Sequence, residues 1–408
     1  MRKILPEHRT LLYVAMFLHD IAKGRIEDHS IAGARIARVF CPRLGLSAAD
    51  TDTVAWLVEQ HLVMSTVAQS RDLSDRKTIE NFAAVVQSLE RMKLLTLLTT
   101  ADIRAVGPGV WNGWKAQLLR TLYYETEPAL TGGFSEVNRA QRVAMAQAEL
   151  KAELKDWPAE RIDAYFARHY PAYWLKVDLP HRIDHARFVR AAEEAGKTIA
   201  TTFSFDPARG VTELTVLAPD HPWLLSSLAG ACAAAAANIV DAQIFTTTDG
   251  RALDTIAVTR EFEQQDDEAR RAKRITDTIE KALSGTLKLP DVVTRRSVPK
   301  GRLKAFSVEP EVTINNQWSN RYTVIEITGL DRPGLLYELT ATLSKLSLNI
   351  TSAHVATFGE RVVDVFYVTD LLGAKIASPT REVAIKRALL QLLSPETNPP
   401  QAKGAAAG

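Results

Sequence analysis

The stretch Leu11-Leu-Tyr-Val-Ala-Met-Phe-Leu-His19-Asp20 ends an apolar run with an adjacent histidine and aspartate. Burying an unpaired carboxylate costs free energy or shifts its pKa until the group is neutral. A bound divalent cation removes that cost, because carboxylate oxygen and imidazole nitrogen are its natural ligands. Three more candidate ligands follow: His29, His61 and Asp102. The first third of the chain is therefore predicted to be a helical metallohydrolase.

The residues around these candidates carry apolar side chains at helical spacing. From residue 8 to about 130, apolar residues recur three and four positions apart. The clearest segments are Ile31–Phe40, Thr53–Met64, Thr78–Leu89 and Met92–Val106. Ser47 is a suitable N-cap for the helix that leads to His61. Residues 135–195 continue in a charged helical pattern, and their aromatic side chains indicate a packed segment.

The second half of the chain repeats itself. Thr212-Glu-Leu-Thr-Val-Leu-Ala-Pro-Asp220 is echoed by Tyr322-Thr-Val-Ile-Glu-Ile-Thr-Gly-Leu-Asp331. Further matches pair Asn238 with Asn349 and Asp254 with Asp364. Each copy is predicted to form a β-α-β-β-α-β module, which is an open antiparallel sheet with helices on one face.

Composition places the chain among ordinary globular proteins. Its 408 residues are enough for two to four domains, and 46% hydrophobic with 24% charged residues is a usual balance. The net charge of +2 gives no reason to expect nucleic-acid binding. No apolar stretch reaches the roughly 18 residues of a membrane span. Two cysteines, Cys41 and Cys232, favour a reducing cytoplasm.

Four motifs of the first third together resemble an HD-superfamily phosphohydrolase domain. They are Leu18-His-Asp-Ile-Ala-Lys-Gly24, Asp28-His-Ser-Ile-Ala-Gly33, Val54-Ala-Trp-Leu-Val-Glu-Gln-His61 and Thr100-Ala-Asp-Ile-Arg104. The two later repeats resemble ACT domains. The implied fold class is α+β multidomain: an all-α HD-type phosphohydrolase domain followed by two βαββαβ (ferredoxin-like, ACT) domains.

Together with Trp111-Asn-Gly-Trp-Lys115, this order of domains resembles the bacterial family of bifunctional uridylyltransferase/uridylyl-removing enzymes. The resemblance implies that the nitrogen-signalling PII protein is the partner and that glutamine is the small-molecule effector. It implies hydrolysis of the uridylyl-tyrosine phosphodiester of modified PII, with release of UMP.

The sequence also departs from that family. Its members begin with a nucleotidyltransferase domain that carries a glycine-serine phosphate turn and an Asp-x-Asp metal pair, and no such turn occurs here. The opening helix with an earlier histidine ligand is not found either; His8 lies only eleven residues before His19 and is not assigned to that role. We expect the chain to correspond to the C-terminal part of such an enzyme and to lack transferase activity.

The resemblance implies a site for Mg²⁺ or Mn²⁺ in the first third. Its metal ligands would be His19, Asp20, His29, His61 and Asp102. His19, Asp20 and Asp102 match the core of the motif. His29 and His61 would complete a larger site, either for a second metal or for the phosphate.

A divalent metal neutralises a phosphodiester and lowers the pKa of its bound water, which makes attack on phosphorus possible. Lys23, one turn after His19, either can reach a phosphate oxygen as a point charge or is simply solvated. The residues expected to act in catalysis are His19, Asp20, Lys23 and His61.

In ACT domains the turn between the first strand and the first helix binds small ligands, often amino acids. In the second copy Pro333 starts the helix, and Gly334 lets a ligand approach exposed backbone N–H groups. In the first copy Trp223 replaces that glycine. Asn349 is either a ligand to an amide or amino group or a turn residue before a strand. The expected ligand-binding residues are Asp331, Arg332, Pro333, Gly334, Leu335, Asn349 and Asp220.

The sequence predicts six segments. They are an N-terminally incomplete HD domain at 1–130, a helical connector at 131–198, ACT domain 1 at 199–288, a linker at 289–320, ACT domain 2 at 321–393 and a disordered tail at 394–408.

Two other functions fit parts of the pattern. A guanosine-tetraphosphate hydrolase also joins an HD domain to an ACT domain, but it carries a synthetase and a small β-rich domain between them. An amino-acid-sensing fragment with an inactive HD domain is the alternative from another class. Metal content separates that alternative from a working hydrolase.

Overall fold

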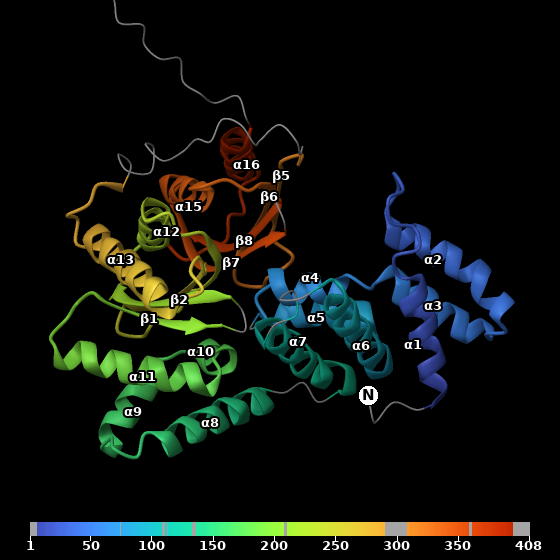
Figure 1. Cartoon of the computed structure of the whole chain (residues 1–408), viewed down its shortest axis with the longest axis horizontal. Helices are drawn as coiled ribbons and strands as arrows, with labels where there is room; N and C mark the ends of the chain where they lie inside the picture. Colours follow the sequence, from blue (N-terminus) through green and yellow to red (C-terminus); the bar gives the residue numbers. More distant parts are fainter. Residues whose placement is uncertain are drawn as a thin grey trace, which may run out of the picture.

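The computed structural model describes residues 6–73, 75–107, 111, 113–132, 136–207, 210–289, 308–358 and 361–394 (Figure 1). All of the predicted tail except Ser394 lies outside these ranges. None of the helices in the described ranges is both long and apolar enough to cross a membrane.

The N-terminal part is all helical. Its elements are α1 (Pro6–Leu18), α2 (His29–Phe40), the short 3-10 helix η1 (Cys41–Leu44), α3 (Ala48–Glu59), α4 (Val63–Ser70), α5 (Arg76–Val86), α6 (Leu89–Ala105) and α7 (Gly113–Thr131). Side chains start four of these helices by accepting backbone N–H groups: Asp28 before α2, Ser47 before α3, Asp75 before α5 and Ser88 before α6. The predicted Ser47 cap is therefore confirmed. Leu57, Leu95 and other fully buried residues form a common core.

Four further helices follow: α8 (Glu136–Glu153), α9 (Ala159–Ala167), α10 (Pro171–Lys176) and α11 (Leu179–Glu194). Most of their aromatic residues are packed, as the sequence indicated, but Tyr170 is exposed. Trp157, Tyr165, Tyr173 and Trp174 lie in one buried cluster together with Leu217 of the first sheet.

The first module contains β1 (Ala200–Asp206), β2 (Val211–Pro219), α12 (Leu224–Ala234), β3 (Ile239–Gln243), β4 (Arg251–Thr259) and α13 (Gln265–Leu283). The second contains β5 (Glu311–Asn315), β6 (Thr323–Leu330), α15 (Leu335–Lys345), β7 (Leu348–Phe358), β8 (Arg361–Asp370) and α16 (Pro379–Leu393). Both sheets are antiparallel, in the orders β1-β2-β4-β3 and β5-β6-β8-β7. The predicted α+β class with two repeated four-stranded sheets is confirmed.

One detail of the module differs from the predicted β-α-β-β-α-β order. In the described residues the fourth strand comes before the module instead of closing it: Ala200 pairs with Leu217, and Val312 pairs with Ile327. An antiparallel edge strand needs only a free edge and a short connection, and the edges of β2 and β6 offer both. Strand β5 consequently lies within the stretch 289–320, which was expected to be a linker, either irregular throughout or with a strand in it.

The two modules pack side by side. Helix α12 lies next to α15 (Figure 1), and strand β3 contacts β7. Gly230 permits the helix contact, because a Cβ at this position would lie 2.8 Å from Cδ2 of Tyr337. Helices α12 and α13 cover one face of the first sheet, and α15 and α16 cover the same face of the second.

The opposite faces of the two sheets are also covered, by different parts of the chain. Helices α8–α11 cover the first sheet, where Tyr173 contacts Phe245 with ring centroids 5.5 Å apart. The segment between α4 and α5 meets the second sheet, where the backbone N–H of Asp72 donates to the hydroxyl oxygen of Tyr367 at 2.8 Å. Strands β4 and β8, one central strand from each sheet, are accordingly buried along most of their length.

Asp254, at the repeat position of Asp364, is a buried carboxyl on β4. It is 1% exposed, and its Oδ1 accepts the N–H of Phe245 at 3.2 Å. No hydrogen bond to its Oδ2 is found within the described ranges. Burial raises the pKa of Asp254 to about 8.

This raised pKa makes stability depend on pH. Between the unfolded pKa and about pH 8 the folded chain holds a proton that the unfolded chain has lost. The contribution to stability is full below the unfolded pKa and disappears as the pH rises through about 8. The free energy of unfolding of the wild type should therefore fall relative to that of Asp254→Asn across this window, measured by urea denaturation. Exposed Asp163→Asn is the control and should keep a constant offset; parallel curves for Asp254→Asn would contradict the prediction.

Candidate metal centre and effector cavity

Five candidate ligands of the N-terminal part meet at one place although they come from four segments. His19 and Asp20 lie in the turn after α1, and His29 is the first residue of α2. His61 lies in the turn between α3 and α4, and Asp102 is on α6. Each of the first four lies at or beside a helix end, where a short turn can direct a side chain inward.

Asp20 is at the centre of this cluster. Its Oδ1 lies 3.7 Å from Nε2 of His29 and 3.9 Å from Nε2 of His61. Its Oδ2 lies 3.7 Å from Nε2 of His19, which is 3.4 Å from Oδ1 of Asp102. Ligand atoms of Asp20, His29 and His61 all lie within 4.8 Å of one another, so these residues could hold one metal ion. Two metal–ligand bonds of about 2.0–2.2 Å each can bridge the 3.7 Å and 3.9 Å between Asp20 and these two imidazoles.

Backbone carbonyls orient two of the histidines. Nδ1 of His19 lies 2.7 Å from the carbonyl oxygen of Met16, and Nδ1 of His61 lies 2.7 Å from that of Val58. An Nδ1–H that donates to a carbonyl leaves the Nε2 lone pair for a metal. In both residues Nε2 is the atom that faces the carboxylates.

The charges of the cluster suit a cation. Burial lowers the pKa of His61, which is 1% exposed, and this favours the neutral imidazole that binds metals. A hydrogen bond to Asp102 raises the pKa of His19. Burial by itself raises the pKa of Asp20, but the hydrogen bond from Lys23 and the nearby positive charges outweigh it and keep this pKa below its ordinary value.

Lys23 borders the cluster on its exposed side. Its Nζ donates to Oδ2 of Asp20 at 2.8 Å, and its side chain is 70% exposed. His8, the histidine left out of the site, instead pairs with Glu90 at 2.9 Å.

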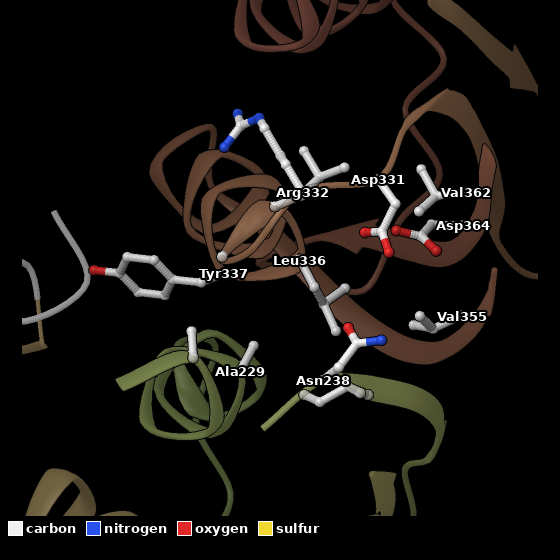
Figure 2. Close-up of a pocket in the computed structure, with 13 residues that line it drawn as sticks. Ala229, Asn238, Asp331, Arg332, Leu336, Tyr337, Val355, Val362 and Asp364 are labelled. Carbon is white, nitrogen blue, oxygen red and sulfur yellow. The ribbon is translucent and has the colours of Figure 1, made fainter. Parts of the chain in front are cut away.

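A second candidate site lies between the two repeated modules. A small cavity of about 40 Å³ opens where the β6–α15 turn faces α12 and the start of β3. Figure 2 shows the carboxyl groups of Asp331 and Asp364 next to each other, with the amide of Asn238 reaching toward Leu336 from the first module. Burial raises the pKa of Asp331. Gly334 takes the left-handed conformation with φ 82° just before α15.

Only part of the expected ligand-binding set lines this cavity. Asp331, Arg332, Gly334 and Leu335 do, although Arg332 points away from the two carboxyl groups (Figure 2). Pro333, Asn349 and Asp220 are not among its lining residues. Asp220 accepts a hydrogen bond from Thr246 at 3.0 Å, and Asn349 lies opposite Thr369 in the β7–β8 pair.

Two lining residues were missed as ligand candidates, namely Asn238 and Asp364. The signal was present, because the repeat matches Asn238 to Asn349 and Asp364 to Asp254. The sequence could not reveal which copy's asparagine faces the turn of the second copy. The turn of the first copy is closed differently: Ser344 at the end of α15 donates to the carbonyl oxygen of Pro222 at 2.9 Å.

Comparison with known proteins agrees with both halves of the structure. Residues 1–95 match the HD domain, and residues 323–378 match the ACT domain. The chain is 72% identical over 394 residues to the bifunctional uridylyltransferase/uridylyl-removing enzyme of a Bradyrhizobium species, covering 97% of the chain and 42% of the relative.

Enzymes of the same description from Nitrobacter hamburgensis and Rhodopseudomonas palustris are 71% identical over 394 residues and 70% identical over 395 residues. These matches cover 97% and 96% of the chain and 42% of each relative. The chain thus spans less than half the length of these relatives. Over almost all of its own length, it is a relative of the bifunctional uridylyltransferase/uridylyl-removing enzymes and combines an HD domain with an ACT domain.

Proposed function

We propose that the HD domain of this chain hydrolyses a phosphodiester with the help of Mg²⁺ or Mn²⁺ and thereby removes UMP from uridylylated PII. The observation that carries the proposal is the convergence of three imidazoles with the carboxylates of Asp20 and Asp102. A mixed set of imidazole and carboxylate ligands suits Mn²⁺ well. The relatives' description as uridylyl-removing enzymes supports the choice of bond.

Each residue then has a defined task. Asp20 and the Nε2 atoms of His29 and His61 would hold the ion, with His19 and Asp102 beside them. A divalent ion in this place neutralises phosphate oxygens and lowers the pKa of its bound water. Lys23 is hydrogen-bonded to Asp20 through Nζ on the exposed side of the cluster, where it would meet the anionic phosphate of an approaching protein substrate.

We further propose that glutamine binds in the cavity between the two modules. The neighbouring carboxyl groups of Asp331 and Asp364 suit an ammonium group, and Asn238 suits an amide. The positive N-terminal end of α15, after Gly334, suits the carboxylate. Because the cavity measures only about 40 Å³, side chains at its mouth must move when the ligand enters.

The metal centre predicts a loss of hydrolysis on substitution. Asp20→Asn and His61→Ala should each weaken Mn²⁺ binding, measured by calorimetry, and lower UMP release from uridylylated PII by roughly a hundredfold or more, because metal sites lose affinity and activity steeply when a ligand is removed. His8→Ala, on the same helix as the approach to His19, is the control and should behave as wild type.

The outcomes separate the possible functions. Unchanged UMP release in Asp20→Asn would contradict the assignment of the centre. A wild type that binds glutamine but neither holds Mn²⁺ nor releases UMP would instead identify the chain as a regulatory fragment.

The effector cavity predicts a difference between the two copies. Asp331→Asn should weaken glutamine binding about tenfold, since a charge-assisted hydrogen bond is lost, whereas Asp220→Asn at the repeat position should leave it unchanged. Titration calorimetry of both variants measures this difference. Equal effects at the two positions would contradict the assignment of the ligand to the turn of the second copy.

A further inference from the structure

The HD domain and the second ACT module meet through a buried contact. The segment after α4 lies on the face of the second sheet that its own helices leave open. There the N–H of Asp72 donates to the Tyr367 hydroxyl at 2.8 Å, with Asp72 6% and Tyr367 0% exposed. A buried backbone N–H that loses its acceptor costs free energy, so this bond favours one docking position.

Charged contacts surround this hydrogen bond. Arg71 pairs with Glu326 of β6 at 2.6 Å, and its guanidinium lies 4.2 Å from the ring centre of Trp318. The carboxylate of Asp72 pairs with Lys176 of α10 at 2.7 Å. Three parts of the chain therefore hold the same short segment: the HD domain, the helical connector and the second module.

Helix α4 joins this segment to the metal centre. It spans the eight residues Val63–Ser70, begins two residues after His61 and ends directly before Arg71. An α-helix of this length is a short rigid rod of about 12 Å. A shift of Asp72 on the sheet therefore moves the turn that carries His61, unless α4 bends.

Strand β8 joins the same contact to the effector cavity. Successive side chains of a strand point to opposite faces, so Asp364 and Tyr367, three residues apart, lie on opposite faces of β8. Asp364 lines the cavity (Figure 2), whereas Tyr367 clusters with Val324 and Val365 on the side of the HD domain. Strand β8 thus carries one residue that lines the cavity and one residue that contacts the HD domain.

We propose that Tyr367 is a positioning residue for the metal centre: its hydrogen bond to Asp72 fixes α4 and, through α4, His61, and it links occupation of the ACT cavity to the geometry of the metal ligands. The link to the cavity rests on the proposed function, whereas the positioning of His61 requires only that the HD domain binds a metal.

The first test measures the affinity of the chain for Mn²⁺ and needs no activity assay. Tyr367→Phe removes one oxygen and leaves the Asp72 N–H without this acceptor. The Kd for Mn²⁺, measured by calorimetry on the whole chain, should rise roughly threefold to tenfold. Tyr322→Phe is the matched control, because its ring packs edge-to-face against Tyr367 with centroids 6.2 Å apart; it should bind Mn²⁺ as wild type does.

A purely structural role for Tyr367 would lower the Tm yet leave the Mn²⁺ affinity of the folded protein unchanged, and that result would overturn the proposal. If Tyr367→Phe does not fold, Glu326→Gln weakens the neighbouring pair with Arg71 and should raise the Kd for Mn²⁺ in the same direction. An unchanged Kd in Glu326→Gln would then overturn it.

The second test measures coupling. Glutamine should change the Mn²⁺ affinity of the wild type, and Mn²⁺ should change the glutamine affinity by the same factor. In Tyr367→Phe this factor should approach one, while glutamine still binds. A wild type that binds both ligands independently, or a variant that keeps the full factor, would refute the link. A wild type that binds no glutamine would refute the proposed effector, and the Mn²⁺ comparison would still decide the role of Tyr367.

Discussion

An antiparallel four-stranded sheet that carries helices on one face can leave its second face to water or cover it with another part of the chain. This chain contains two such sheets, and their central strands β4 and β8 are buried along most of their length. The second face is covered by a different part of the chain in each sheet. Helices α8–α11 cover the first sheet, and the HD domain packs on the second. The arrangement of the whole molecule follows from covering these two faces.

The candidate metal centre depends on a related constraint, because placing several charged groups close together costs free energy. Asp20 is partly buried among three imidazoles, and Lys23 on its open side compensates its charge. Backbone carbonyls fix His19 and His61 so that Nε2 faces inward. The ligand set is therefore oriented by the polypeptide itself, and its shape follows the turns at the ends of α1 and α3. A movement of either turn therefore changes the positions of the side chains that it carries: His19 and Asp20, or His61.

The segment between α4 and α5 is involved both in covering the second sheet and in positioning a candidate metal ligand. It closes the open face of the second sheet and lies one short helix away from His61. The two ACT modules also share their packing, with α12 beside α15, and the cavity lies at that junction. One continuous packed structure consequently contains the cavity, the second sheet and the candidate metal ligands.

The sequence by itself determined the local features, namely the helical periodicity, the Ser47 cap and the repeat, because short-range spacing and side-chain chemistry record them. The five candidate ligands followed from their side-chain chemistry and from the resemblance to HD motifs. Only the tertiary structure decided that β1 and β5 precede their modules, since an edge strand needs nothing more than a free edge. It also decided that Asn238, rather than Asn349, faces the second turn, because two equivalent copies can pack in either sense. The bond between Asp72 and Tyr367 joins residues 295 positions apart. No local pattern records such a contact, because it arises from the match of two surfaces that form only after each part has folded.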